Sequence, residues 1–174
     1  MTDKTTLLEE HGLYRPEFER DNCGFGLIAH MDGKPSHWLV MTAIKALERL
    51  THRGAIAADG KTGDGCGLLL KKPDRFMLQI ASGAGFELTE IYAVGMVFLN
   101  QDAQRAAAAK ARLESALQEE GLSVAGWREV PTDPSACGEE ALRTLPHIEQ
   151  VFVNAAPGLT ETDFERHLYI ARRV

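Results

Sequence analysis

Cysteine and histidine are the side chains of this sequence that most readily act as nucleophiles, bases or metal ligands. The 174 residues include six histidines and three cysteines, Cys23, Cys66 and Cys137. The cysteines are odd in number, widely spaced and in no Cys-x-x-Cys pair, so they predict no disulfide framework. This usage is typical of a protein in a reducing cytoplasm.

Cys23 stands where the character of the chain changes, and Gly24 follows it. Residues 1–22 carry six acidic and three basic side chains without apolar periodicity, which indicates a leader appended to the domain. If the chain is cleaved between Asn22 and Cys23, the new α-amino group has a reference pKa of ~7.7–8.0 and lies within reach of the thiol as a base. A neighbouring glycine also lets substrate approach the backbone closely. The alternative is that Cys23 is a small buried residue at the start of a strand.

A dinucleotide site is the first competing interpretation of this region. Residues 24–29 match G-x-G-x-x-A, but that fingerprint needs a strand before it and a helix starting on it. Acidic residues precede the glycines and a strand-like run follows them. We therefore expect these glycines to allow close strand packing instead.

A metal site is the second competing interpretation. The available ligands are Cys23, His30, His37, His52 and Cys66. Their spacing matches neither a structural zinc pattern nor an H-E-x-x-H helix. We therefore expect no metal site in this chain.

The elements that must position these residues follow from the apolar periodicity. Helices are predicted over 38–51, 73–81, 102–120, 138–145 and 160–173, and strands over 23–30, 68–71, 92–99, 123–130 and 148–154. Asp32-Gly33 is typical of a turn, and Thr160 with Asp163 is close to a capping box at a helix start. The pattern indicates one folded unit with mixed helices and strands.

Composition and charge exclude several classes of protein. Apolar residues make up 44% and the net charge is −6, so nucleic-acid binding has no electrostatic support. No apolar run approaches the ~20 residues that cross a bilayer. The first residues, MTDKTTLLEE, resemble neither a secretory signal nor an Arg-rich transit peptide. We therefore expect no membrane or nucleic-acid partner.

Two segments carry a resemblance to a known family. ERDNCGFGLIAHMDGKPSH and ALERLTHRGAIAADGKTGDGCGLLL resemble the start of the large chain of bacterial glutamate synthases, which is a class II glutamine amidotransferase domain of the N-terminal-nucleophile (Ntn) hydrolase type. The resemblance implies an α+β fold, the αββα four-layer Ntn sandwich, of which residues 23–174 are the amino-terminal part. It also implies that residues 1–22 are a cleavable propeptide.

The resemblance assigns roles residue by residue. Cys23 matches the nucleophile that attacks the side-chain amide of L-glutamine, and its freed amine matches the base. Arg53 matches an arginine that helps to order the glutamine pocket. Asp64-Gly65 matches a structural turn, and Cys66 stands where a small buried residue is expected.

The resemblance also implies parts that lie beyond Val174. The family's carboxylate-binding and oxyanion-hole segments are absent from these residues, so we expect the 174 residues alone to be inactive. FMN and a 3Fe-4S cluster are expected in further domains that aminate 2-oxoglutarate. The expected electron donor is NADPH, through a small partner subunit, in preference to ferredoxin.

Two alternative functions stay open from the sequence. The chain could be a catalytically silent module that keeps the fold for packing or assembly. It could also belong to another class II amidotransferase, of the amidophosphoribosyltransferase or asparagine synthetase type. The DGKTGDGCGLLL segment and the long leader favour glutamate synthase.

Overall fold

The structure, a computed structural model, describes residues 25–50, 56–63 and 65–173. The chain divides into two compact parts, Met1–Arg53 and Gly54–Val174. In the first part a loop leads to helix α2 (His37–Glu48), which confirms the helix predicted over 38–51. The predicted turn is also present: the amide of Gly33 donates to the carbonyl of His30 at 3.0 Å, and Gly33 has a φ of +66°.

The structure does not confirm the strand predicted over 23–30. Phe25–His30 forms no strand, and the two residues before it lie outside the described part of the chain. An apolar run with glycines fits a strand, but a strand exists only where a second strand supplies the ladder of hydrogen bonds. The sequence pattern contains no information about that partner.

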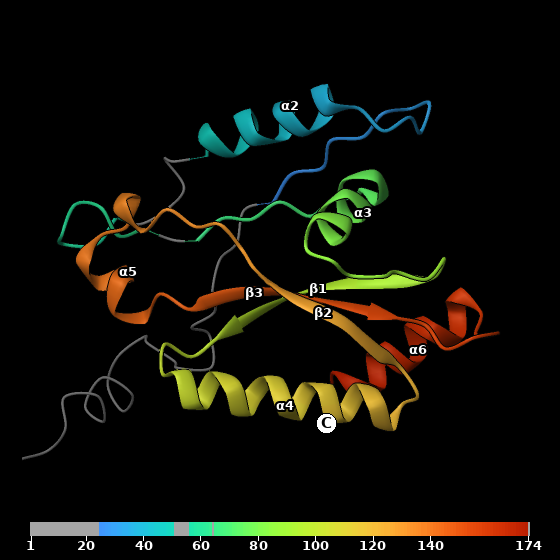
Figure 1. The fold of residues 1–174 in the computed structure, drawn as a ribbon. Coiled ribbons are helices and arrows are strands. Elements are labelled where there is room, and N and C mark those ends of the chain that lie inside the picture. Colours follow the sequence, from blue (N-terminus) through green and yellow to red (C-terminus); the bar gives the residue numbers. More distant parts are fainter. Residues whose placement is uncertain (1–24, 51–55, 64, 174) are drawn as a thin grey trace, which may run out of the picture. The chain divides into compact units, whose positions relative to one another are not determined.

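The second part contains most of the regular structure (Figure 1). Its elements, in order, are α3 (Asp74–Gly83), β1 (Tyr92–Leu99), α4 (Ala103–Glu119), β2 (Ser123–Glu129), the 3₁₀ turn η3 (Pro134–Ala136), α5 (Glu139–Thr144), β3 (His147–Asn154) and α6 (Glu161–Ala171). Each of these helices and strands was predicted to within a few residues, apart from η3. None of the helices in the described part of the chain is long and apolar enough to cross a bilayer.

The strand predicted over 68–71 is also absent, because Leu68–Lys71 has no regular secondary structure. Lys72, which follows it, is nevertheless fixed to the sheet by its side chain. Its Nζ donates to the carbonyl of Tyr92 at 2.8 Å and lies 3.6 Å from the centroid of the Tyr92 ring. The segment is therefore held through a side chain and not through a strand ladder.

The three strands form one antiparallel sheet in the order β1-β3-β2. Both outer strands run antiparallel to β3, so β1 and β2 are parallel to each other. Helix α4 connects β1 to β2, and β3 lies between these two strands in the sheet. In the register, Gly95 and Trp127 both lie opposite Val151. The burial of β3 follows from this central place: its run from Glu149 to Val153 is buried throughout.

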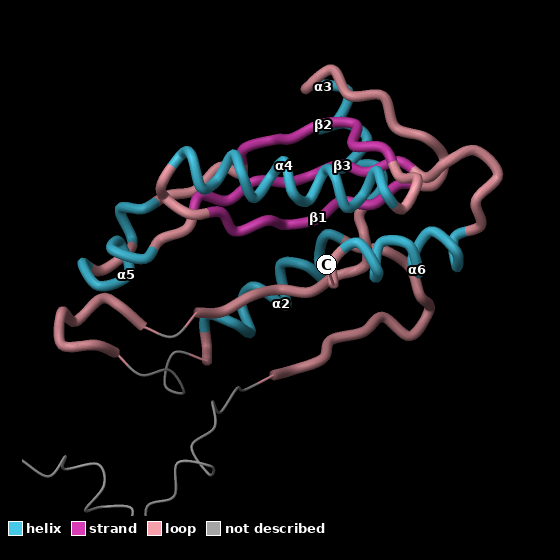
Figure 2. Tube along the Cα trace, turned by 90° about the horizontal axis from the view of Figure 1, so that it is seen from below, coloured by secondary structure: helices cyan, strands magenta, loops and turns pink. Residues whose placement is uncertain are grey.

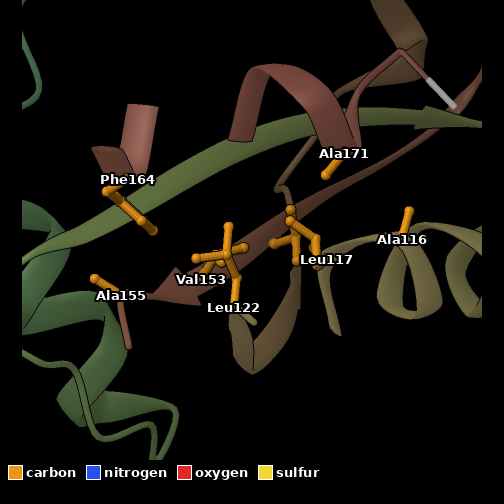
Figure 3. Close-up of a cluster of buried hydrophobic side chains, with 8 residues drawn as sticks. Ala116, Leu117, Leu122, Val153, Ala155, Phe164 and Ala171 are labelled. Atoms are coloured by element: carbon orange, nitrogen blue, oxygen red, sulfur yellow. The ribbon is translucent and has the colours of Figure 1, made fainter. Parts of the chain in front are cut away.

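Helices α4 and α6 cover one face of the sheet, as Figures 1 and 2 show. Val151 and Val153 of β3 pack against them. The buried cluster between these layers comprises Ala116, Leu117, Leu122, Val151, Val153, Ala155, Phe164 and Ala171, most of which are drawn in Figure 3. Burying such side chains contributes roughly 1.5–3 kcal/mol each for the larger ones. This cluster is the core of the Gly54–Val174 part.

The opposite face of the sheet is covered near Phe152, which is fully buried. The Phe86 ring, just after α3, packs on the Phe152 ring with centroids 5.5 Å apart. It also lies directly over Gly126, where a Cβ atom would be 2.3 Å from the ring. Only glycine fits at that point of β2, next to the register shift between Val124 and Gly126.

Candidate functional site

The residues predicted to do the chemistry lie outside the described part of the chain. Asn22, Cys23 and Arg53 are all in this group, and so is Asp64. Their roles therefore remain predictions. The structure does describe residues 56–63, which follow Arg53 in the sequence, and they have a definite geometry.

The loop after Arg53 is closed on itself. Ile56 and Gly63 form an isolated antiparallel bridge, and the amide of Ala57 donates to the carbonyl of Thr62 at 2.7 Å. Gly60, at the tip, has a φ of +70° and its amide donates to the carbonyl of Ala57 at 3.0 Å. Residues 56–63 thus form a compact turn and not an open connection.

Asp59 organises the inside of this turn. Its Oδ1 accepts hydrogen bonds from the amides of Lys61 at 3.0 Å and Thr62 at 2.7 Å, and its Oδ2 accepts one from the Thr62 hydroxyl. These bonds to the ionised form, the Thr62 hydroxyl above all, hold the pKa of the Asp59 carboxyl well below its ordinary value. Asp59 is therefore an ionised acceptor at neutral pH and well into the acid range.

The same two side chains reach α5, about eighty residues further along the chain. Oδ2 of Asp59 accepts a long hydrogen bond of 3.4 Å from the amide of Glu140, and the Thr62 hydroxyl accepts one of 3.3 Å from the amide of Ala141. Gly138, the N-cap residue of α5, has no side chain with which to accept these donors. Asp59 and Thr62 therefore act as the missing cap from a distant part of the sequence.

The contact between this loop and α5 is also tight. A Cβ atom on Gly138 would lie 2.3 Å from both Asp59 Oδ2 and Thr62 Oγ1. Gly138 is needed because the loop occupies the space of a side chain. We name this arrangement of Asp59, Thr62 and Gly138 the loop clamp.

The other end of α5 is held in a similar way. The Gln101 side-chain amide donates to the carbonyls of Leu142 at 3.1 Å and Leu145 at 2.8 Å. Gln101 lies just after β1, so it connects the end of α5 to the sheet. Through the loop clamp and Gln101, residues 56–63 are linked to the core of this part of the chain.

The described part of the chain contains two cysteines, Cys66 and Cys137. Cys66 is exposed, which corrects the expectation that it is a small buried residue. Within the described part of the chain, nothing lies within 4 Å of a Cβ built on the flanking Gly65 or Gly67. Cys137 is half-buried next to the loop clamp. Among the described residues there is no cluster of three or more potential metal ligands.

A second polar cluster lies on the sheet face that α4 covers. Glu149 has a side chain that is only 12% exposed, and it accepts from Lys110 Nζ at 2.6 Å and lies 3.3 Å from His147 Nε2. Lys110 Nζ also stands 4.5 Å from the centroid of the Trp127 ring. Periodicity could not reveal this cluster, because its members come from α4, β2 and β3.

The sequence contains one local signal for the loop clamp. Asp59-Gly60 is a turn dipeptide, and an Asp followed by Gly, Lys and Thr is suited to accepting from amides two and three residues on. No local pattern could connect it to Glu140 and Ala141. Only the fold brings those donors to the carboxylate.

Comparison with known proteins identifies the family. The profile of the Glutamine amidotransferases class-II matches residues 23–174. The chain belongs to this family. The predicted mixed helix-and-strand fold of a class II glutamine amidotransferase agrees with the match.

Individual relatives narrow the likeness to glutamate synthases. The chain is 40% identical over 163 residues to the NADPH glutamate synthase large chain of Bacillus subtilis (strain 168), covering 93% of this chain and 11% of that protein. It is 42% identical over 164 residues to the NADPH large chain of Azospirillum brasilense, with 92% and 11% covered. It is 41% identical over 158 residues to ferredoxin-dependent glutamate synthase 1 of Arabidopsis thaliana, with 90% and 10% covered. The chain thus spans about a tenth of the length of these relatives.

Proposed function

We propose that this chain is the amino-terminal part of the glutamine-hydrolysing domain of a glutamate synthase. The observation that carries the proposal is the class II amidotransferase match, which begins at Cys23, together with the likeness to glutamate synthases of both bacteria and a plant. The fold of the complete domain would be the four-layer αββα Ntn sandwich. The sheet of β1, β3 and β2 with α4 and α6 on one face would supply one sheet layer and one helix layer of it.

The chemistry would belong to Cys23, once the leader is cleaved after Asn22. The freed amine would take the thiol proton, and the sulfur would attack the side-chain amide carbon of L-glutamine. A C–S bond forms, the C–N bond breaks, and nitrogen leaves as ammonia after protonation. Water then hydrolyses the γ-glutamyl thioester to glutamate and restores the thiol. Arg53 would help to order the glutamine pocket.

The rest of the reaction would take place in other parts of the polypeptide. There the ammonia would aminate 2-oxoglutarate, in domains that would hold FMN and a 3Fe-4S cluster. Electrons would come from NADPH through a small partner subunit in the cytoplasm. Relatives of the NADPH and ferredoxin classes match this chain at similar identity, so the preference for NADPH depends on the leader and motifs alone.

Substitution of the cysteines in the full-length polypeptide tests the nucleophile. Cys23→Ala is expected to abolish glutamine-dependent glutamate synthesis and to leave ammonia-dependent synthesis, because amination occurs elsewhere. Cys66→Ala and Cys137→Ala are the matched controls and should retain both activities. Loss of glutamine use in Cys66→Ala alone, at normal stability, would contradict the assignment of Cys23.

The intact mass of the purified enzyme tests the leader. Active enzyme is expected to lack Met1–Asn22, since the terminal-amine mechanism needs a free amine on Cys23. Active enzyme that retains these residues would exclude that mechanism. An uncleaved and inactive enzyme would instead favour the catalytically silent module.

A glutaminase assay on residues 1–174 alone tests the extent of the active domain. We expect no turnover, because these residues lack the family's oxyanion-hole and carboxylate-binding segments, and loss of one oxyanion donor alone costs ~10²–10³ in rate. Turnover near that of the full-length enzyme would show that those segments are dispensable.

A further inference from the structure

We propose that β1 is an inner strand of the complete sheet, and that its outer edge pairs with the first strand that follows α6 in the polypeptide. This fourth strand would run antiparallel to β1 and cover a cavity between β1, α4 and α6. The inference rests on the proposed function in one respect, because it needs the longer polypeptide of a glutamate synthase, of whose length this chain spans about a tenth.

The outer edge of β1 presents backbone groups that have no strand partner. The amide of Ala155 donates to the carbonyl of Ile91 at 3.0 Å, and hydrogen-bonded pairs alternate along an antiparallel ladder. In the register of β1 and β3, this alternation turns the amides and carbonyls of Val94, Met96 and Phe98 away from β3. No backbone group in the described part of the chain pairs with them. Such a row of donors and acceptors is a template for another strand.

The other edge of the sheet, formed by β2, has features that discourage pairing. The register of β2 shifts between Val124 and Gly126, and Arg128 and Glu129 place two charges at its end. Irregularities and charged side chains of this kind protect a true edge strand. The eight residues of β1, YAVGMVFL, include neither a charge nor a proline, and their register with β3 is unbroken. β2 therefore has the properties of an edge strand, and β1 those of an inner strand.

The connection through α4 indicates the edge at which a further strand joins. β1 and β2 are parallel, α4 connects them, and β3 lies between them. β3 is followed by α6, which covers the same face of the sheet as α4 (Figure 2). Crossovers between parallel strands are almost always right-handed. Because β3 runs opposite to β1, a second crossover of the same hand moves across the sheet in the opposite direction. It passes over β1 and places a strand parallel to β3 at the outer edge of β1.

Space for this strand lies at the end of α6. A cavity of about 480 Å³ lies between β1, α4 and α6. Its lining includes the small residues Gly95, Ala109, Ala116 and Ala171, together with Arg172. Ala171 is the last residue of α6 and Arg172 is its C-cap, so the helix ends beside the open edge of β1. Alternate side chains of an added strand would face this cavity.

A second copy of the chain is the alternative occupant of this edge. Each copy carries a net charge of −6, and like net charges oppose association. A strand of the same polypeptide needs no bimolecular encounter, because the chain holds it at a high effective concentration. The position of the end of α6 also favours a strand of the same polypeptide.

Amide hydrogen exchange at single-residue resolution tests the proposal on the full-length polypeptide and on the 174-residue chain. The amides of Val94, Met96 and Phe98 are expected to exchange about 100-fold more slowly in the full-length polypeptide, because each would donate to the fourth strand. The first strand after α6 should contain slowly exchanging amides at alternate positions, since only one of its edges would be paired.

The same two samples contain internal controls. The amides of Gly95 and Val97 point toward β3, so they should exchange slowly in both polypeptides. The amides of Trp127 and Glu129 point away from β3 on the outer edge of β2, and they should exchange rapidly in both. A general difference in stability between the two polypeptides would change all of these amides together and is thereby distinguished from pairing at β1.

A substitution in the cavity tests where the fourth strand lies. Ala109→Phe places a ring in the cavity and is expected to restore rapid exchange at the outward amides of β1 in the full-length polypeptide. Ala111→Phe, at an exposed position of the same helix outside the cavity lining, is the matched control. Ala109 is itself exposed, so the larger side chain should be compatible with folding, and slow exchange at Gly95 and Val97 verifies this.

Three results would overturn the inference. Equal exchange of the outward amides in both polypeptides would show that the edge of β1 gains no partner. Slow exchange in the 174-residue chain that depends on its concentration would show that a second copy occupies the edge. Slow exchange in the full-length polypeptide that Ala109→Phe leaves unchanged would show that the pairing strand does not cover the cavity. A full-length polypeptide that cannot use glutamine but shows the expected exchange would refute the proposed function alone.

Discussion

Two short helices of the Gly54–Val174 part, α5 and α6, are held in place by different means. α6 buries Phe164 and Ala171 in the core, and its own Thr160 caps its first turn by accepting from the amide of Asp163. None of the six residues of α5 is buried, and its N-cap is Gly138. α5 is held at both ends by side chains from other segments, as described for the loop clamp and Gln101.

The two means of attachment differ in strength and in their dependence on pH. Apolar burial is insensitive to pH and is shared among many contacts, so α6 should remain in place over a wide range of conditions. Exposed polar contacts contribute less free energy and depend on protonation. The weaker attachment holds residues 56–63 against α5, whereas the stronger one maintains the core.

The largest expected effect is in the apolar region. Phe164→Ala leaves a cavity between α6 and the sheet and should lower the free energy of unfolding by about 4 kcal/mol. Phe76→Ala is the matched control, since Phe76 is 56% exposed, and it should cost under about 1 kcal/mol. Urea unfolding of the chain measures both. Equal losses in the two variants would show that α6 is not held by burial.

The next effect tests a polar contact placed inside the apolar region. Lys110→Met leaves the nearly buried Glu149 carboxylate without its closest cation and should cost about 2 kcal/mol. Adding Glu149→Gln removes the unpaired charge, so the double variant should regain part of the loss. A double variant no more stable than Lys110→Met alone would show that the pair does not govern the stability of this cluster.

Tyr92 combines apolar burial with a polar contact, because its ring is buried and its hydroxyl donates to Asp74 at 2.9 Å. Burial, and then this bond, raise the pKa of Tyr92 to about 12. The raised value means that the contribution to stability is fully present below a pH of ~10 and is lost as the pH rises toward the folded-state pKa. Tyr92→Phe should therefore cost about 1 kcal/mol near neutral pH, and less at higher pH. Urea unfolding at several pH values measures this, and a loss that stays constant above that pH would contradict it.

The smallest effect on global stability is expected from the loop clamp. The pKa of Asp59 is lowered in the folded state, so its contribution is present above the unfolded value of ~3.9 and is lost as the pH falls further. Asp59→Asn should therefore be slightly less stable than wild type near neutral pH and equal to it in strong acid. Gln101→Ala, at the other end of α5, is the control and should show no such pH dependence in thermal unfolding. If the stability difference between Asp59→Asn and wild type increased as the pH fell, the prediction would be contradicted.

Helices were the elements that local sequence predicted best. The spacing of apolar residues and the caps placed α4 and α6 almost to the residue, because helix hydrogen bonds join residues four apart in the same segment. The strands β1, β2 and β3 were also predicted, since their apolar runs are bounded by turn residues. The same kind of run failed at Phe25–His30 and Leu68–Lys71, where a strand would have needed a partner from elsewhere.

The sequence by itself was sufficient for the family, because the Cys-Gly-Phe-Gly and Thr-Gly-Asp-Gly-Cys-Gly segments are specific and a family match confirmed them. It also determined which segments form helices, and that Thr160 caps the first turn of α6. Only the tertiary structure decided that Cys66 is exposed, that Glu149 is paired with Lys110, and that Asp59 caps a helix. Each of these depends on which distant segments meet. A folded chain brings residues together across a sequence separation that no local periodicity encodes, and burial and hydrogen bonding at those meeting points determine their properties.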